Sequence, residues 1–183
     1  MSRLERYPIF QNGFLVNDLE ESCTRWSRVF GAGPFQIFRH HRTERFSYRG
    51  KPVEADVSYA FGYLGDLMLQ LTEQHDDTPS IYREMYARGE EGFHHIACLV
   101  TDFAAERQRL LDLGFEIACE LYADGVDAAY FDTRALNGCF TEIHGDPWHI
   151  LGGFARWRRA HDAMRPDDPP FVVRHSGPPA KSA

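Results

Sequence analysis

The sequence predicts an α+β fold in which two copies of one module, each a strand and a helix followed by three strands, form one curved sheet. The first observation is a repeat: residues 11–18 and residues 95–102 are both short apolar runs that end in Asp and lead into a helical pattern. The second is that each half later carries a strand-like stretch with a polar residue among apolar ones, at 67–71 and at 139–143. These matches lie 84 residues apart (95 minus 11) and 72 residues apart (142 minus 70), so one duplicated unit with loops of unequal length explains both.

The two predicted helices begin and end at residues that favour helix termini. Asp18 and Asp102 stand where an N-cap is expected, because an Asp side chain accepts a hydrogen bond from a free backbone N–H of the first turn. Gly31 and Gly114 stand where a left-handed C-cap is expected, since glycine adopts that conformation without a side-chain clash. The caps predict helices over 18–30 and 102–113.

Alternating apolar residues and turn residues divide the rest of each copy into strands. The first copy also contains a long polar excursion, at 42–54. The predicted strands are 9–16, 34–41, 55–64 and 67–73 in the first copy, and 93–100, 115–122, 127–133 and 139–144 in the second.

Two half-open sheets can close on each other, so we expect one domain with a partly closed mixed sheet and the helices outside it. A C-terminal segment has helical periodicity, with Trp148, Leu151, Phe154, Ala155 and Trp157 as a buried stripe. The proline-rich end of the chain is expected to be extended or mobile. The expected parts are module 1 at about 8–74, a linker helix at about 79–88, module 2 at about 92–146, a helix at about 147–164 and a tail at 165–183.

Composition points to a small-molecule partner. A formal net charge of -7 and a pI of about 5.7 provide no basic surface for nucleic acid or for an anionic membrane. No apolar run of about 18 residues is present, and no signal-type core follows the N-terminus, so we expect a cytoplasmic protein.

The aromatic content of 14% fits an aromatic-lined interior. The cysteines Cys23, Cys98, Cys119 and Cys139 form no C-x-x-C pair and are expected to be core residues.

Strand alternation decides which side chains face the interior of the sheet. Residues two apart in a strand share a face, and the helices should cover the opposite face. Gln70 and Glu142 are therefore expected on the concave face, whereas Leu69 and Ile143 are expected under the helices. The alternation adds Met68, Phe140 and His144 to the concave face.

With these residues placed, the chain resembles the vicinal oxygen chelate superfamily, which includes glyoxalase I, methylmalonyl-CoA epimerase, extradiol dioxygenases and bleomycin resistance proteins. The resembling segments are 11–30, 67–73, 94–113 and 138–145. The resemblance implies paired modules whose strands curl round a metal site, with ligands at the start of the first strand and in the last strand of each module. On this chain the implied ligands are Gln11, Gln70, His95 and Glu142, and Gln in the second position is the pattern of methylmalonyl-CoA epimerase.

Gln11 departs from the pattern, because metal-dependent members usually have His there. A neutral amide oxygen is a weaker donor to a divalent ion than an imidazole nitrogen or a carboxylate oxygen. Two amides, one imidazole and one carboxylate supply a single formal negative charge. Two alternatives therefore remain open: a loosely held Zn, Co, Ni, Mn or Fe ion, or a hydrogen-bonding pocket in which His95 and Glu142 form a buried pair without metal.

Other polar residues give weaker signals. Arg39 belongs to a basic cluster at 39–42, which can meet a carboxylate or phosphate of a substrate or simply end a strand in solvent. His75, Asp76 and Asp77 have the composition of a metal cluster, yet they are consecutive in a loop, where turn formation and helix capping explain them better. His94 is expected to point away from the site and to pack under a helix.

The leading hypothesis is a metal-assisted isomerase, epimerase or lyase that stabilises an enolate-type intermediate, in which Glu142 or His144 moves the proton. The substrate pocket is expected to include Met68, Phe140 and Arg39. A ring-cleaving iron dioxygenase is disfavoured, since its triad needs two His and one carboxylate. The alternative is a metal-free protein that sequesters a drug or a hydrophobic metabolite, as bleomycin resistance proteins do. The subunit number stays open, with a homodimer as one alternative.

Overall fold

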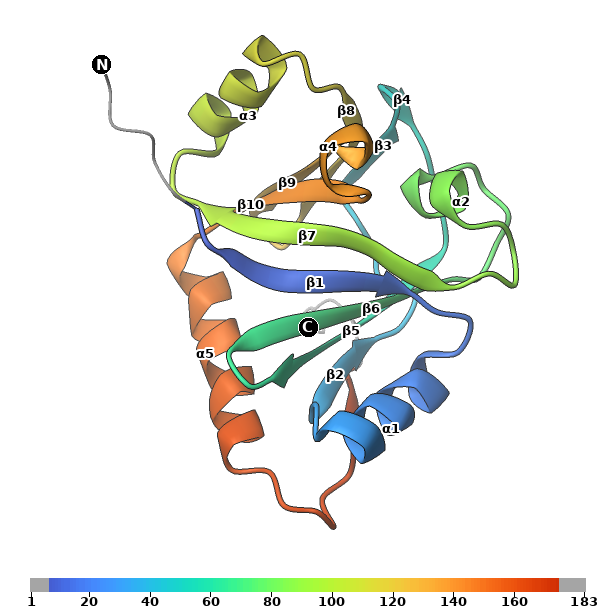
Figure 1. Ribbon diagram of the computed structural model, residues 1–183, viewed down its shortest axis with the longest axis vertical. Helices are drawn as coiled ribbons and strands as arrows, with labels where there is room; N and C mark the ends of the chain where they lie inside the picture. The colour runs from blue at the N-terminus through green and yellow to red at the C-terminus, as the bar shows by residue number, and fades with distance from the viewer. Residues whose placement is uncertain (1–6, 175–183) are drawn as a thin grey trace, which may run out of the picture.

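Both halves of the chain form a strand, a helix and further strands, with a short helix between the halves and another helix after them (Figure 1). The computed structural model describes residues 7–174. The elements of the first half are β1 (Ile9–Leu15), α1 (Leu19–Phe30), β2 (Phe35–Phe38), β3 (Arg45–Tyr48), β4 (Lys51–Pro52), β5 (Val57–Leu64) and β6 (Leu67–Gln74). The remaining elements are α2 (Ile81–Met85), β7 (Gly92–Val100), α3 (Phe103–Asp112), β8 (Ile117–Ala123), β9 (Val126–Phe131), α4 (Arg134–Asn137), β10 (Phe140–Gly145), α5 (Trp148–Asp162) and β11 (Phe171–Arg174).

The described strands form one sheet in the order β11-β2-β5-β6-β1-β7-β10-β9-β8-β3-β4. The two modules meet at its centre, where β1 and β7 pair antiparallel. On either side the pattern repeats, because β1 pairs in parallel with β6 and β7 pairs in parallel with β10. The sheet is curved, and α1 and α3 pack on its outer face, which confirms the predicted α+β fold of two βαβββ modules (Figure 1).

The predicted helix caps are present. The Asp18 carboxylate accepts a hydrogen bond from the backbone N–H of Glu21 at 2.9 Å, and Asp102 accepts one from Ala105 at 3.0 Å. Gly31 ends α1 in the left-handed conformation, with a φ of 71°. Each such cap stabilises its helix by about 1 kcal/mol, so the two helix starts are fixed locally as well as by packing.

The strand faces also follow the alternation. Leu69 and Leu71 pack with Leu19 and Cys23 of α1 in one buried cluster. Ile143 packs with Leu110 of α3 in another. Because a one-residue slip would exchange the faces of a strand, these contacts fix the register that turns Gln70 and Glu142 inward.

The polar excursion at 42–54 is a hairpin rather than a loop. Its strands β3 and β4 extend the second module, since β3 pairs antiparallel with β8. The turn is made by Arg49 and Gly50, whose φ angles of 47° and 75° suit a tight two-residue turn. The sequence predicts only a long polar excursion here, because the pairing of β3 with β8 is a long-range contact.

Part of the predicted tail also belongs to the sheet. Its residues 171–174 form β11, which pairs in parallel with β2 at the sheet edge. The end of that tail, residues 175–183, lies outside the described residues.

The buried stripe predicted for the C-terminal helix is partly wrong. Phe154 and Trp157 of α5 do face the interior, but Trp148 is 84% exposed, and Leu151 and Ala155 are exposed as well. The buried side of α5 instead continues through Gly153 and reaches His161, whose ring nitrogens bond to Gly33 and Gly65 at 2.7 and 3.1 Å. The helix therefore lies against the loops of the first module.

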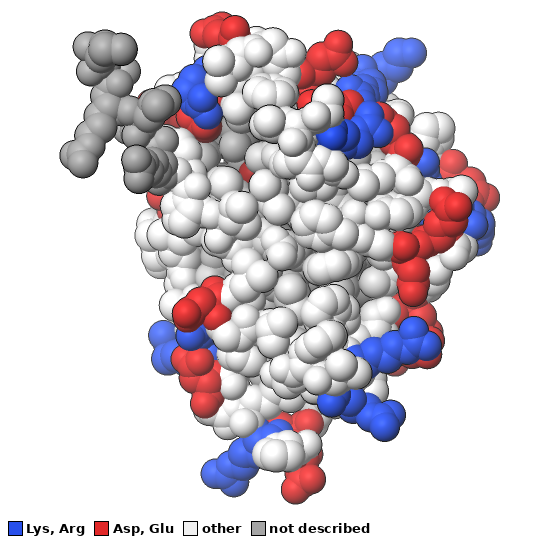
Figure 2. All heavy atoms as spheres, in the orientation of Figure 1, with Lys and Arg blue, Asp and Glu red and all other residues white. Residues whose placement is uncertain are grey.

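Charged residues gather at the rim of the face shown in Figure 2, and the surface over the central strands is largely uncharged. Among the described residues, no helix is long and apolar enough to cross a membrane.

An ion-pair network joins the β3–β4 hairpin to the second half of the chain. The Arg49 guanidinium contacts Glu84 and Asp132, at 2.6 Å each, and Arg134 contacts the same two carboxylates at 2.6 Å. Hydrogen bonds from Arg134 and Arg49 hold the pKa of Asp132 well below its ordinary value. The network therefore ties together the hairpin, α2 and the turn between β9 and α4.

We expect Asp132→Asn to lower the free energy of unfolding at pH 7 by about 1–2 kcal/mol, because two arginines lose a charged acceptor. The lowered pKa of Asp132 means that its contribution is present above about pH 4 and is lost as the pH falls below that value. Urea unfolding between pH 2.5 and 7 should therefore show that the free energy of unfolding falls less steeply with decreasing pH in the variant than in the wild type. Asp127→Asn, which removes an exposed ion pair with Arg45, is the control and should cost under about 0.5 kcal/mol. Equal losses in both variants would contradict the importance of the network.

Candidate active site

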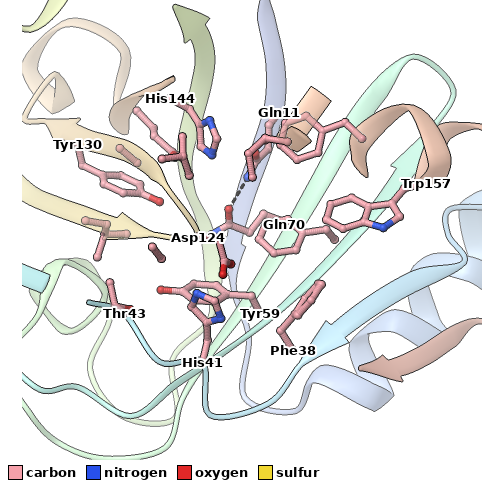
Figure 3. A pocket seen from close by; sticks show the side chains of 18 residues that line it. Gln11, Phe38, His41, Thr43, Tyr59, Gln70, Asp124, Tyr130, His144 and Trp157 are labelled. Atoms are coloured by element: carbon pink, nitrogen blue, oxygen red, sulfur yellow. Dashed lines mark hydrogen bonds between the residues drawn. The ribbon is translucent and has the colours of Figure 1, made fainter. Parts of the chain in front are cut away.

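A cavity of about 160 Å³ lies inside the curved sheet (Figure 3). Helix α5 contributes to its wall, and the rest comes from strands of both modules and the turn between β8 and β9. This volume is close to that of an engineered cavity that holds benzene, so it accepts a group about the size of one six-membered ring. The wall is largely aromatic, through Phe38, Tyr59, Phe61, Tyr130, Phe154 and Trp157.

The four residues predicted as metal ligands lie on the four central strands, and each is less than 5% exposed. Two rows of the sheet bring them together. In one row Gln11 and Glu142 flank Ala97, and in the next Gln70 and His95 flank a glycine. The small residues in the middle of each row leave space between the longer side chains. Gln11, Gln70 and Glu142 line the cavity, whereas the His95 ring is fully buried beside Glu142.

The ring nitrogens of His94 and His95 form a chain that fixes the tautomer of both. His94 Nε2 donates to the carbonyl of Ile81 at 3.2 Å, so its Nδ1 accepts from His95 Nδ1 at 2.9 Å. Burial and the neighbouring His95 lower the pKa of His94 well below its ordinary value, which keeps that ring neutral. The lone pair of His95 Nε2 is then directed at Glu142.

His95 Nε2 and Glu142 Oε2 lie 3.3 Å apart, and neither atom has a hydrogen-bond partner among the described residues. Both atoms are acceptors. Two buried acceptors at this distance are costly unless a proton or a cation lies between them. A divalent ion fits this pair, because imidazole nitrogen and carboxylate oxygen are the donors it prefers.

The two amides are held by each other. Gln11 Nε2 donates to Gln70 Oε1, and Gln70 Nε2 donates to Thr72 Oγ1 at 3.1 Å (Figure 3). The Oε1 of Gln70 is therefore already used, and Gln11 Oε1 is the amide oxygen left to accept from another group. The residues fit a divalent ion held mainly by His95 and Glu142, with one amide as a weak third donor.

The side chain of His94 does not point to the opposite face from that of His95, although alternation predicts this; it does pack against a helix, through Ile81 and Tyr82 of α2. The register of β1 against β7 shifts, because Gly13 pairs with His95 whereas Phe14 pairs with Phe93. His94 is thus the extra residue of a β-bulge, which turns its side chain inward together with that of His95. Its ring packs against Tyr82 and Phe140, with centroids 5.0 and 5.2 Å away.

His144 lines the cavity, on the same strand as Glu142. Its Nδ1 donates to the carbonyl of Gly145 at 2.6 Å, which leaves Nε2 of the neutral ring as an acceptor. Phe10 and Phe154 contact the ring, with centroids 6.1 and 5.9 Å away. His144 Nε2 is therefore the ring nitrogen left to accept a hydrogen bond or a proton.

Three residues predicted for the substrate pocket lie outside the cavity wall. Met68 and Phe140 are fully buried, and Phe140 packs in the core at one end of the sheet. Arg39 follows β2 and pairs with Glu20 of α1 instead of reaching the cavity. Alternation gave the correct face for Met68 and Phe140, but it does not give the depth at which a side chain lies along the strand.

The wall also contains His41, which belongs to the predicted basic cluster at 39–42, and Asp124, which was not among the predicted site residues. His41 lines the wall with its Nδ1 buried and without a partner among the described residues, and this burial lowers the pKa of the ring while the charge of Asp124 raises it. Asp124 occupies the β8–β9 turn with a φ of 52°. The Asp-Gly sequence there predicts a turn but not the direction of the side chain. In Figure 3, His41 and His144 lie on opposite sides of Gln70.

Tyr130, an aromatic residue of the cavity wall, contacts Glu142. Tyr130 lies opposite Glu142 on the neighbouring strand β9. Burial, the charge of Glu142 and a hydrogen bond with it raise the pKa of Tyr130 well above its ordinary value. Tyr130 therefore stays protonated and helps to hold the Glu142 carboxylate in place.

The paired modules and the convergence of Gln11, Gln70, His95 and Glu142 are the arrangement that the vicinal oxygen chelate resemblance implies. Residues 10–131 match the model of the Glyoxalase/Bleomycin resistance protein/Dioxygenase superfamily, and the chain belongs to that superfamily. The resemblance seen in the sequence is thereby confirmed. No curated protein sequence matches the chain.

Solved structures share the fold. A methylmalonyl-CoA epimerase from Mycobacterium tuberculosis has a TM-score of 0.59 and 14% identity, over 83% of this chain and 97% of that one. A methylmalonyl-CoA epimerase in complex with methylmalonyl-CoA and NH4+ has a TM-score of 0.57 and 22% identity, over 78% and 96%. A variant of the Streptomyces coelicolor epimerase in complex with 2-nitronate-propionyl-CoA gives the same four values. At these identities the likeness establishes the fold alone.

We expect Gly13→Ala to disrupt the site, because a Cβ there would lie 1.8 Å from Cε1 of His95. The ring cannot retreat, since His94 and Tyr130 pack against it. Urea unfolding should show a loss of about 1–3 kcal/mol, the usual cost of an overpacked core. Gly152→Ala is the control: it lies in α5 with its nearest neighbour atom 4.0 Å away and should be neutral or stabilising. A Gly13→Ala protein as stable as the wild type would mean that His95 is not held as described.

Proposed function

We propose that the protein is a metal-assisted isomerase or epimerase that moves a proton at the carbon next to a carbonyl group. The observation that carries the proposal is the buried pair of acceptors, His95 Nε2 and Glu142 Oε2, at the cavity. His95 and Glu142 would hold the ion, with Gln11 as a weaker donor and Gln70 orienting Gln11. A divalent ion bound there supplies a Lewis acid that stabilises negative charge on a substrate oxygen.

The proton would be moved by cavity histidines. His144 Nε2 is an acceptor near Glu142 on the same face of β10, which suits removal of a proton from a bound substrate. Epimerisation also needs a group on the opposite side of the carbon to return a proton. His41 stands on the other side of Gln70 and has an unpaired ring nitrogen (Figure 3). His41 and His144 therefore form a pair suited to opposite faces of one carbon.

The cavity supports a small acyl substrate. Its volume of about 160 Å³ takes a short branched acyl group, and the aromatic residues of its wall favour apolar substituents. The residues that line it include no Lys or Arg, so we assign recognition to the carbonyl and the acyl group and not to an anionic end. Since structures with the same fold contain methylmalonyl-CoA and 2-nitronate-propionyl-CoA, a 2-substituted acyl thioester is the substrate class that we propose.

Proton exchange tests this function directly. The metal-loaded protein in D₂O should replace the α-proton of a 2-substituted acyl thioester, with methylmalonyl-CoA as the first probe, and NMR measures the rate. We expect His144→Ala to slow exchange by a factor of about 10²–10⁴, the usual contribution of a general base. His41→Ala should slow the return of a proton from the other face and so reduce epimerisation more than exchange.

The control is Trp148→Ala, because Trp148 is 84% exposed. It should exchange at the wild-type rate. Absence of exchange from the wild type with 2-substituted thioesters would overturn the proposed reaction. Equal rates in wild type and His144→Ala would remove His144 from it.

Metal affinity gives a second test. Glu142→Gln removes the only carboxylate among the four proposed ligands and should weaken binding of Zn, Co, Ni, Mn or Fe(II) at least tenfold. Gln11→His replaces an amide by an imidazole and should tighten it. Calorimetric titration in buffer without chelating components measures both, with Glu54→Gln as an exposed control. Tight binding in the cavity that survives Glu142→Gln would contradict the ligand set.

The second candidate function is a metal-free binding protein for a hydrophobic small molecule. The aromatic wall and the mutual hydrogen bond of Gln11 and Gln70 favour it, because they form a pocket that is complete in part without metal. In that case the wild type, Glu142→Gln and Gln11→His would bind every ion alike, and an aromatic ligand would quench the fluorescence of Trp157. The titration therefore separates the two functions.

A further inference from the structure

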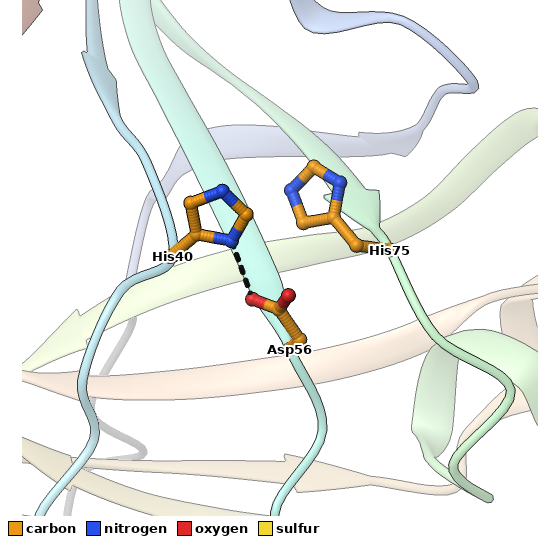
Figure 4. Close-up of side chains that lie close together, drawn as sticks. All are labelled: His40, Asp56 and His75. Carbon is orange, nitrogen blue, oxygen red and sulfur yellow. Dashed lines mark hydrogen bonds and ion pairs between the residues drawn. The ribbon is translucent and has the colours of Figure 1, made fainter.

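We propose that the protein binds a divalent transition-metal ion, such as Zn²⁺, Ni²⁺ or Cu²⁺, at a surface cluster of His40, Asp56 and His75 outside the cavity (Figure 4). His40 follows β2, Asp56 precedes β5 and His75 follows β6. One possible ligand atom from each residue lies within 4.8 Å of the other two. The inference does not depend on the function of the cavity.

The cluster is close to the geometry of a three-ligand site. His40 Nδ1 and Asp56 Oδ1 are 2.8 Å apart, and the ring centroids of His40 and His75 are 4.6 Å apart. Zinc binds imidazole and carboxylate at about 2.0–2.2 Å, so two ligands of one ion stand about 3–3.5 Å apart. Small rotations of the side chains reach these distances. Such rotations are open to His40 and Asp56, whose side chains are 61% and 43% exposed.

The hydrogen bonds around His75 place the lone pair of its ring on Nε2, where the Ser58 hydroxyl occupies it, so metal binding requires this hydroxyl to turn away. Ser58 Oγ accepts from the backbone N–H of His40 at 2.9 Å, so its own proton points to His75 Nε2 at 2.7 Å. On the other side of the ring, His75 Nδ1 lies 3.3 Å from Glu73 Oε1. A histidine that ligates a metal commonly donates its second N–H to a carboxylate, which fixes the tautomer and strengthens the donor. Glu73 stands where that carboxylate is needed.

The backbone at His40 is strained. Its φ of 46° lies in the left-handed region, which a residue with a Cβ enters only at a cost. The exposed ring gains little from burial in return. Strain of this kind persists where the side chain has to be aimed at a site. Here it sends the His40 ring toward Asp56 while the next residue, His41, reaches the cavity.

The charges near the cluster favour a cation. Asp56 is in it, Glu73 contacts His75, and Asp76 accepts from the backbone N–H of Asp56 at 3.1 Å. Arg83 approaches this region but bonds to the carbonyl oxygens of Gln74 and Asp76, at 2.7 and 3.3 Å. Its charge is thus directed at backbone groups and not at the Asp56 carboxylate.

The sequence tract His75-Asp76-Asp77 contributes only its first residue. Asp76 makes the turn that its position suggests, since its carboxylate accepts from Gln74 at 2.9 Å and from Thr78 at 2.8 Å. Asp77 pairs with Arg88. The other two ligands come from distant parts of the chain, and only the fold brings them to His75.

A bound ion would connect the segment between β2 and β3 to β5 and β6. That segment also carries His41 and Thr43 of the cavity wall. The ion would therefore clamp one wall of the cavity from outside, in addition to the backbone hydrogen bonds from His41 to Val57 and from His75 to Asp56.

Titration of Cu²⁺ and Zn²⁺ tests the site, in the Glu142→Gln background so that the cavity pair does not contribute. We expect one ion per chain, with electron paramagnetic resonance of Cu²⁺ showing coupling to two imidazole nitrogens. His75→Gln and Asp56→Asn should each weaken binding at least tenfold, and His75→Gln should leave one coupled nitrogen. Asp77→Asn removes an exposed carboxylate from the same turn and is the matched control, with unchanged affinity.

A further variant keeps the test independent of folding. His40→Gly should abolish binding yet raise the urea midpoint of the metal-free protein, because glycine occupies a φ of 46° without strain. The proposal is overturned if the His75, Asp56 and His40 variants bind as tightly as their parent, or if Asp77→Asn weakens binding equally. The outcome for this site is separate from the outcome for the cavity. If the wild type binds an ion that Glu142→Gln no longer binds, and the cluster binds none, the metal site of the proposed function stands and this site is refuted.

Discussion

The register between β1 and β7 is the constraint on which the rest of the site depends. These strands join the two modules, and a bulge places His95 directly opposite Gly13. With any side chain at position 13 the His95 ring could not lie where it does. The same bulge turns His94 inward, and His94 fixes the tautomer of His95. One shift of register in the backbone thus creates both the space for the imidazole and the direction of its lone pair.

Much of this arrangement could be predicted because it follows from periodicity. Caps at Asp18 and Asp102 and the alternation through Gln70 and Glu142 are local signals, and the duplication brings them to one place. The bulge at His94 interrupts the alternation without any marker in the sequence, so its side chain was assigned to the wrong face. The β3–β4 hairpin was missed because pairing with β8 is a long-range contact that no local pattern encodes. Phe140 has the predicted face but lies outside the cavity wall. Its position depends on the curvature of the whole sheet, which no local pattern encodes.

The cavity combines a strong donor pair with weak partners. His95 and Glu142 are buried and directed at each other, whereas Gln11 and Gln70 satisfy part of their hydrogen bonding between themselves. Binding an ion through an amide therefore competes with an existing hydrogen bond, while binding through His95 and Glu142 relieves two buried acceptors. An ion bound there would therefore be held chiefly by His95 and Glu142 of the second module, with Gln11 of the first module as a weaker partner.

The segment after β2 connects the inner site with the outer cluster through two consecutive residues. In a regular strand, neighbours point to opposite faces, but β2 ends at Phe38 and the left-handed φ of His40 sets the directions instead. His41 then faces Tyr59 in the cavity, with ring centroids 5.6 Å apart, and His40 faces Asp56 outside. An interaction that holds the His40 side chain in place also restricts the backbone of His41, because one peptide unit joins the two residues. Ligand contacts at the surface can thus change the cavity wall without any change in the sheet, whose register is set elsewhere by β1 and β7.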